Sequence, residues 1–270
     1  MNDINFTFGI ITDAQNGVND FLPRAVQSIR ELHIPKYEII IVGTKREIIK
    51  HEILSPDSRL TIIDFDESIK AKWITKKKNL ITKNAKYDNI VYQHDYVTYD
   101  KNWYNGWKEF GDDYVACMNV IKNLDGTRYR DWVIFPDSFS EDLRNYANIQ
   151  NNESMLPYDD NRFIKWQYFS GAYWVAKKWL MKEIPLEEFL VWGEGEDVRW
   201  SHYVRSKYDL KMNPHSTVQI LKQHNPAFGP IRKECYDKII EYYNKIQNGE
   251  IKDWWQIHED KIKNGTIKWW

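Results

Sequence analysis

The sequence predicts an α/β protein in which a mostly parallel β-sheet is flanked by helices and followed by a helical C-terminal appendage. In the N-terminal third, short Ile- and Val-rich runs alternate with longer amphipathic segments, which is typical of βαβ units. Polar residues follow these runs directly, at the sheet edge where open parallel sheets bind ligands. Beyond Ile231 the chain has helical spacing, interrupted near Gly249 and Gly265.

The expected elements follow from these patterns in chain order. The apolar runs predict strands at residues 6–11, 38–42, 60–65, 88–93, 115–121 and 169–177. The amphipathic segments predict helices at residues 18–32, 46–54, 69–86 and 198–205. The polar segment 136–165 is too long for an ordinary connection and is expected to carry function or form a lid. We therefore expect one domain over residues 1–226 and a helical extension, 227–270, packed on it.

Composition narrows the classes of function. The 270 residues carry a net charge of −1 and no long basic tail, so nothing indicates nucleic-acid binding. Two cysteines are too few for a disulfide framework or a cysteine zinc site. No signal-peptide pattern and no apolar run near the ~20 residues of a membrane helix is present, so we expect a soluble, cytoplasmic protein. Aromatic residues, 15% of the chain, suit sugar or partner surfaces as well as ordinary cores, and the oligomeric state stays open.

An acidic stretch, residues 192–201 (WGEGEDVRWS), gathers Glu194, Glu196 and Asp197 at the start of a predicted helix. The positive end of a helix stabilises carboxylates, so these residues either cap an ordinary helix or present a base to a bound hydroxyl. A run of lysines, 76–78, is interpreted as a solvated helix face.

Further candidates lie elsewhere along the chain. Asp95 directly follows a predicted strand, where a carboxylate can hold a divalent cation between phosphates, and His94 is either a ligand or a hydrogen-bonding residue at the strand end. Gly171 permits either a close backbone approach or a β-bulge, beside the aromatic faces of Tyr173 and Trp174. Three more candidates are ambiguous in the same way. Arg128 and Arg130 either clamp an anion or form surface ion pairs, and His224 is either a metal ligand or an exposed loop residue.

Taken in order, these features resemble a GT-A glycosyltransferase (a Rossmann-like fold) of the family 2-like group, over roughly residues 4–226. The corresponding motifs are the nucleotide-binding start at Thr12-Asp13, an Arg-Asn pair at Lys78-Asn79, the Asp-x-Asp motif at 93–96, the acceptor strand at 170–174, the Glu-Asp motif at 196–197 and a late metal-binding histidine at His224. The chain departs from the family in having Asp95 as the single aspartate of the Asp-x-Asp motif. It also lacks the acidic residue after the second strand, a role that Asp64 is expected to share.

The resemblance implies transfer of a sugar from a UDP-sugar, with UDP-glucose or UDP-galactose as first choices, to a hydroxyl of a carbohydrate or glycoprotein acceptor. It implies that Asp95 and His224 hold Mn²⁺ or Mg²⁺, that Asp197 is the base of an inverting reaction, and that Glu196 orients the acceptor or base. It further assigns nucleotide binding to Thr12, Asp13, Asp64, Lys78, Asn79 and His94, and acceptor binding to Trp174, Trp192 and Arg128.

Two alternatives share parts of this pattern. A sugar nucleotidyltransferase has a similar early βαβ layout but needs a glycine-rich phosphate loop, and the segment 12–17 contains a single glycine. A non-catalytic carbohydrate-binding relative would explain the incomplete Asp-x-Asp motif, whereas the acidic stretch argues against it.

Overall fold

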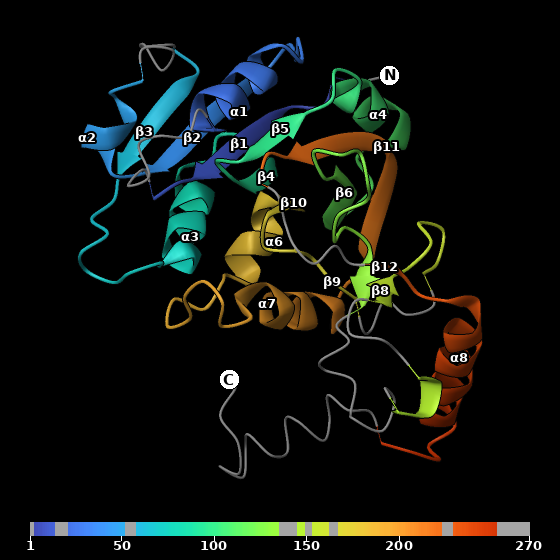
Figure 1. Cartoon of the computed structure of the whole chain (residues 1–270). Helices are drawn as coiled ribbons and strands as arrows, with labels where there is room; N and C mark the ends of the chain where they lie inside the picture. Colours follow the sequence, from blue (N-terminus) through green and yellow to red (C-terminus); the bar gives the residue numbers. More distant parts are fainter. Residues whose placement is uncertain are drawn as a thin grey trace.

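The main feature of the protein is an eight-stranded sheet with the strand order β3-β2-β1-β4-β10-β6-β11-β5 (Figure 1). The computed structural model describes residues 3–13, 21–51, 58–134, 145–148, 153–161, 167–222 and 229–252. The strands of this sheet are β1 (Phe6–Ile11), β2 (Tyr37–Gly43), β3 (Leu60–Asp64), β4 (Asn89–His94), β5 (Val97–Tyr99), β6 (Ala116–Lys122), β10 (Tyr173–Lys177) and β11 (Leu210–Ile220).

Strand direction determines which loops meet. Strands β3, β2, β1 and β4 are parallel, so β1 and β4 end at the same edge. Strand β10 runs antiparallel to β4 and therefore begins at that edge, with Tyr173 opposite Gln93. Strand β11 is parallel to β6 and antiparallel to β5. The α/β sheet flanked by helices that the sequence predicts is confirmed.

Helices cover both faces of the sheet (Figure 1). One face carries α1 (Phe21–Arg30) and α4 (Trp103–Phe110), and the other carries α3 (Ile74–Asn84), α6 (Lys178–Glu183) and α7 (Glu196–Arg205). Helix α1 buries Leu22, Ala25, Val26 and Ile29, which share one face at helical spacing. Burial on both faces explains why β1 and β4 appear in the sequence as continuous apolar runs instead of alternating ones.

A smaller sheet, in the order β12-β8-β7-β9, lies beside the main one. Its strands are β7 (Val133–Ile134), β8 (Glu153–Met155), β9 (Gln167–Tyr168) and β12 (Gly229–Pro230). The first described residues after 226 thus form a strand, and helix α8 (Lys233–Gln247) follows, burying Cys235 and Ile239. Most of the predicted lid 136–165 lies outside the described residues.

Several elements differ from the sequence prediction. The short α2 (Lys45–Ile48) occupies part of the predicted helix 46–54, and β10 is shorter than the predicted strand 169–177 because residues 170–172 turn between the two sheets. Helix α4 and the first part of β11 were not expected. Within the described ranges, no helix combines the length and apolar character needed to cross a bilayer.

Helix α4 packs on a bulge of β11 through Gly106, since an added methyl group there would overlap the backbone carbonyl of His215. We expect Gly106→Ala to lower the free energy of unfolding by about 1–3 kcal/mol, as overpacking of a filled contact does, even though alanine favours a helix. Urea denaturation measures this change. Asn105→Ala, on the exposed side of the same helix, is the control. Equal midpoints for the two variants would contradict the contact.

Candidate active site at the carboxyl ends of the parallel strands

Thr12 and Asp95 join the ends of β1 and β4. The Thr12 hydroxyl donates a hydrogen bond of 2.7 Å to Oδ2 of Asp95. Burial raises the pKa of the Asp95 carboxyl, while the Thr12 hydrogen bond and the charges of Lys222 and Lys77 oppose this shift. The charge of Asp13, exposed just after Thr12, also acts on Asp95. The structure therefore places Thr12, Asp13 and Asp95 close together at this edge.

Lys77 holds the loop after β1 in place. Its ammonium donates to the backbone carbonyl of Thr12 at 2.8 Å and forms an ion pair with Glu67. Both Lys77 and Lys78 are buried, so the interpretation of the lysine run as a solvated helix face is wrong for these two residues. Amphipathic spacing alone gave no sign of this, because the backbone carbonyls of Thr12 and Gly171, which accept hydrogen bonds from Lys77 and Lys78, lie far away in sequence.

Asp197 lies in the first turn of α7, where backbone groups hold both of its carboxylate oxygens. Oδ2 accepts a hydrogen bond of 2.6 Å from the Gly171 amide, and Oδ1 accepts one of 2.9 Å from the Val198 amide. Gly195, with φ 68°, precedes the helix in the left-handed conformation that favours glycine. The half-buried Asp197 carboxylate is thus fixed at the positive end of a helix.

The segment 170–172 lies between Asp197 and the end of β4, the strand that precedes Asp95. The His94 amide donates to the Ala172 carbonyl at 3.1 Å, so Gly171 lies beside the end of β4. A Cβ atom on Gly171 would lie 3.0 Å from both Glu196 Oε1 and Asp197 Oδ2. Of the two interpretations of this glycine, the close approach is the one found in the structure. Asp95 directly follows β4, and Asp197 is bonded to Gly171 beside the end of β4. The two carboxylates therefore lie at the same edge of the sheet.

Glu196 differs from Asp197 in its surroundings. Only 5% of Glu196 is exposed. Burial and the neighbouring Asp197 raise the pKa of the Glu196 carboxyl to about 8, against the opposing charges of Lys78 and Arg130. Burial therefore favours the protonated form of Glu196, whereas the half-buried Asp197 is the more accessible acid.

Arg130, and not Arg128, is the arginine whose charge acts on Glu196 and Asp197. Arg128 donates to Asp131 Oδ1 at 2.6 Å and lies 4.0 Å above the ring of Tyr158, so its guanidinium is used in a local structural contact. Burial disfavours the charged form of Arg130, but Tyr168, Tyr129 and Asp197 raise its pKa above the usual value. The sequence presents both arginines in one stretch and contains no signal that separates them.

The two tryptophans predicted to bind an acceptor lie in different settings. Trp174 is fully buried, and its ring stacks on Tyr92 and on Trp200 with centroids 5.4 Å from each. Its ring is thus enclosed by protein, unlike the prediction that it meets the acceptor. Trp192 is 56% exposed on the loop before α7, with the Lys72 ammonium 4.9 Å from its ring centroid. Only the second ring is available to a ligand in this structure.

The remaining predicted residues are more scattered. The Asn79 amide donates to the Leu186 carbonyl at 2.8 Å and so holds the loop before α7 instead of facing the Asp95 edge. Asp64, at the end of β3, accepts a hydrogen bond of 2.8 Å from the Lys45 amide at the start of α2. The half-buried ring of His94 stacks on Tyr96 at 5.0 Å, next to Asp95. His224 lies outside the described residues.

Asp95 supplies one carboxylate at this edge, so a cation held there would have to be shared with a phosphate ligand. Among the described residues, no group of three or more histidine, cysteine or acidic side chains is close enough to hold a metal ion by itself. Hard cations such as Mg²⁺ are often held by one or two carboxylates together with substrate phosphates. Asp95, a carboxylate at the ligand edge, meets that requirement.

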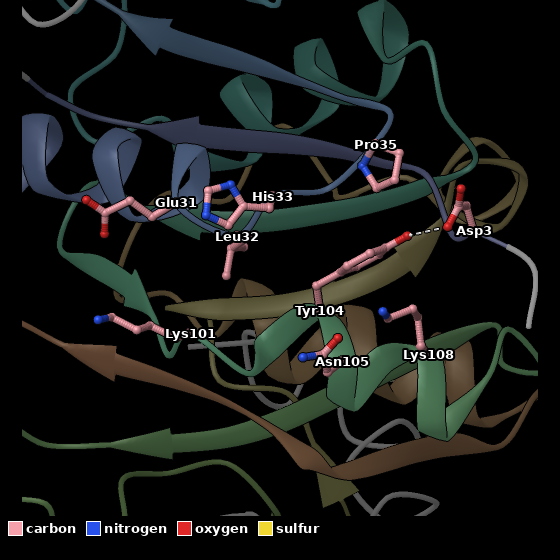
Figure 2. Close-up of a pocket in the computed structure, with 9 residues that line it drawn as sticks. All are labelled: Asp3, Glu31, Leu32, His33, Pro35, Lys101, Tyr104, Asn105 and Lys108. Atoms are coloured by element: carbon pink, nitrogen blue, oxygen red, sulfur yellow. Dashed lines mark hydrogen bonds between the residues drawn. The ribbon is translucent and has the colours of Figure 1, made fainter.

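A separate hollow lies at the opposite ends of the parallel strands (Figure 2). It has a volume of about 610 Å³, and Asp3, which precedes β1, and Pro35, which precedes β2, form part of its lining. Figure 2 shows Tyr104 of α4 facing Asp3, with 3.5 Å between the hydroxyl and Oδ1. None of the predicted site residues lines this hollow, and its charges are mixed. The acidic group at the other edge is therefore the stronger candidate for chemistry.

This protein has a GT-A fold, and the resemblance seen in the sequence is confirmed at the level of the fold. The crystal structure of GalNAc-T7 with UDP, GalNAc and Mn²⁺ is similar, with a TM-score of 0.58 and 14% sequence identity over 82% of this chain and 44% of that chain. This chain thus spans less than half the length of the GalNAc-T7 structure. S. aureus TarS 1–349 aligns with a TM-score of 0.49 and 14% identity, over 96% of this chain and 69% of that chain. No family model and no curated protein matches the sequence.

Proposed function

We propose that this protein is a glycosyltransferase that moves a sugar from a UDP-sugar to a hydroxyl group of a carbohydrate or glycoprotein acceptor. The observation that carries the proposal is the Asp197 carboxylate, held by two backbone amides beside the strand end that bears Asp95. UDP-glucose and UDP-galactose are the donors to test first. The GT-A fold supports the proposal, because the similar GalNAc-T7 structure contains UDP and GalNAc.

Asp197 acts in this proposal as the general base. A carboxylate has about four lone-pair positions, so after accepting two amide hydrogen bonds Asp197 can still accept the proton of an acceptor hydroxyl. Removal of that proton raises the nucleophilicity of the acceptor oxygen as it attacks the anomeric carbon. Attack from the side opposite the leaving UDP inverts the anomeric configuration. The protonated Glu196 donates a hydrogen bond that orients the acceptor or the base.

The donor lies, in this proposal, along the ends of β1 and β4. Thr12, Asp13 and Asp95 face the nucleotide there, and Asp64 and His94 remain nucleotide-binding candidates at neighbouring strand ends. A divalent cation, Mn²⁺ or Mg²⁺, would be held by Asp95 with the diphosphate oxygens, and His224 is a second candidate ligand. When bound, the cation supplies neutralisation of the negative charge on the leaving diphosphate. Lys222 and Lys77 contribute positive charge to the same edge.

The acceptor lies, in this proposal, against the loop before α7. Helix α3 and the turn before it hold this loop, since the Thr75 hydroxyl donates to the Leu190 carbonyl at 2.7 Å and the Trp192 amide donates to the Lys72 carbonyl at 3.0 Å. The exposed ring of Trp192 offers an apolar face of the kind that packs on sugar rings. Trp174 stays behind the site as part of its wall, and Arg130 takes the place that the sequence assigned to Arg128.

Calorimetry with UDP tests the donor site. We expect UDP to bind the wild-type protein in the presence of Mn²⁺, and Asp95→Asn to weaken this binding by tenfold or more, which corresponds to ~1.4 kcal/mol or above. Asp88→Asn, an exposed aspartate beside the opposite end of β4, is the matched control and should bind as wild type does. Unchanged affinity in the Asp95 variant would remove Asp95 from the donor site.

A UDP-release assay with a panel of UDP-sugars and acceptors then separates the three candidate functions. Release that depends on an acceptor supports transfer. Tight UDP binding without turnover of any donor favours a non-catalytic relative. Pyrophosphate release from UTP and a sugar phosphate favours a nucleotidyltransferase. Absence of UDP binding both with and without Mn²⁺ would contradict the proposal.

A further inference from the structure

Lys78 of α3 is a fully buried cation next to the acidic pair. Its ammonium donates a hydrogen bond of 2.9 Å to the Gly171 carbonyl and lies 4.0 Å from the centroid of the Trp174 ring. The side chain has 0% exposure, and Trp174 is itself enclosed. Protein groups thus surround this ammonium, whereas a residue that binds a nucleotide presents its charge to the ligand. The burial argues against the nucleotide-binding role that the sequence assigned to Lys78.

Gly171 links Lys78 to both acids. Its carbonyl accepts from Lys78, while its amide donates to Asp197 Oδ2 at 2.6 Å. Glu196 Oε1 and Asp197 Oδ2 both pack against its Cα, at a distance that leaves little room for a side chain. A displacement of Gly171 would therefore move the hydrogen bond that holds Asp197, and Lys78 restrains that displacement.

We propose that Lys78 is a positioning residue that holds Gly171 against Asp197 and places a buried positive charge beside the Glu196–Asp197 pair. This inference rests on the proposed function, because it assigns Asp197 as the base. It deepens that function by giving the pH dependence of the reaction a defined cause.

The charges around the pair support this role. Burial lowers the pKa of Lys78 to about 8, and the charges of Glu196 and Asp197 oppose the shift. The groups that act on the pair from the surrounding elements are Lys78 of α3, Arg130 after β6 and Tyr96 after β4. Arg130 interacts in addition with Tyr168 and Tyr129, and of the two cations Lys78 has the larger effect on Glu196. An isolated buried ammonium would be strongly disfavoured, which explains why this lysine occurs beside two carboxyls.

Lys78→Met tests the inference in the transfer reaction, because methionine fills a similar space without a charge. Loss of an opposite charge near a carboxyl raises its pKa by about 1–3 units, so we expect the alkaline limb of the pH–kcat profile, on which Glu196 loses its proton, to move up by about one unit. Because Gly171 no longer holds Asp197 as firmly, we expect kcat on the plateau to fall about tenfold, while KM for the UDP-sugar changes less than twofold. Lys83→Met, an exposed lysine in the last turn of the same helix, is the control and should leave both unchanged. A raised KM for the UDP-sugar with an unmoved pH profile would overturn the proposal and restore the nucleotide-binding role.

A titration by NMR tests the same inference without catalysis. In Lys78→Met the ¹³C carboxyl resonance of Glu196 is expected to titrate at a higher pH than in the wild type. In Glu196→Gln, a nearly isosteric change, the ¹⁵Nζ resonance of Lys78 is expected to titrate below its wild-type midpoint, since one of its stabilising charges is gone. The second variant decides the question if Lys78→Met does not fold. Unchanged midpoints would overturn the inference about Lys78, whereas wild-type protein that titrates as expected but transfers no sugar would contradict the proposed function alone.

Discussion

Asp197→Asn is expected to lower kcat for sugar transfer by about 10²–10⁴-fold, the range by which a positioned general base accelerates a reaction. Asparagine retains the shape of the side chain and one oxygen acceptor. It cannot take a proton from the acceptor hydroxyl, and its amide nitrogen cannot accept the hydrogen bond that either the Gly171 or the Val198 amide donates. The loss should therefore appear in kcat, while the affinity for UDP, bound at the neighbouring strand ends, stays within twofold of the wild type.

Steady-state kinetics with saturating UDP-sugar measures this effect, and calorimetry checks UDP binding in the same preparation. Glu194→Gln is the matched control because this carboxylate lies in the same stretch and accepts a hydrogen bond of 2.8 Å from the Val191 amide, within its own loop. We expect the control to retain most of the activity. A transfer rate within threefold of wild type for Asp197→Asn would eliminate Asp197 as the base.

The protein is also expected to lose stability as the pH rises from about 5 to 8, and Glu196→Gln should remove much of this loss. The pKa of Glu196 is about 8 in the folded protein, compared with 4.5 ordinarily. Between these values the folded state holds a proton that the unfolded chain has released. Glu196 therefore stabilises the fold fully below its unfolded pKa, and this contribution disappears as the pH passes through the folded pKa.

Lys78 acts in the opposite direction above pH 8. Its folded pKa is about 8 and its ordinary value is 10.5, so in this window the unfolded chain holds the additional proton. The contribution of Lys78 is present above 10.5 and is lost as the pH falls through its folded pKa. The two groups therefore change stability in opposite directions as the pH rises: Glu196 lowers it and Lys78 restores it.

Urea denaturation at intervals of half a pH unit measures the predicted curve. One pKa unit corresponds to ~1.4 kcal/mol, so the shift of Glu196 sets an upper bound of ~5 kcal/mol on the difference between pH 4 and pH 8.5. Comparison with Glu196→Gln isolates this group from other acids, such as Asp95 and Asp131, whose pKa is also raised. Parallel stability curves for the two proteins would contradict the assignment of a protonated Glu196.

The strands of the N-terminal half were predictable because their residues are buried on both faces. Such strands consist almost entirely of apolar residues, so β1, β2 and β4 emerge from composition alone. The first part of β11 lacks this signal. It contains Pro214 and the buried polar pair Asn213 and Ser216, whose side chains hydrogen-bond at 3.0 Å across a bulge. Helix α4 was missed for a related reason, because Gly106 weakens its helical pattern and is required by the contact with β11.

The candidate site was predictable where a residue follows a strand or begins a helix. Asp95, which follows β4, and Asp197, in the first turn of α7, are candidates that the sequence predicts on this ground. Roles that depend on long-range partners could not be found: Asn79 and Leu186 are far apart in the sequence, as are Lys78 and Gly171. The exchange of Arg128 for Arg130 has a different origin: Asp131, which engages Arg128, is only three residues away, but its burial is recognisable only in three dimensions.

Helix α3 holds two separate loops of the candidate site in place. Thr75 and Asn79 fasten the loop 186–194 at its middle and its start, while Lys77, on the same helix, fastens the loop after β1. The loop that bears Trp192 and the loop after β1 are therefore both held by one helix. If the proposed function holds, substitutions in the Trp192 loop, between its attachment points, are expected to change the accepted glycan without disturbing the donor site. Relatives that share these attachment residues would then be expected to use one nucleotide sugar on many different acceptors.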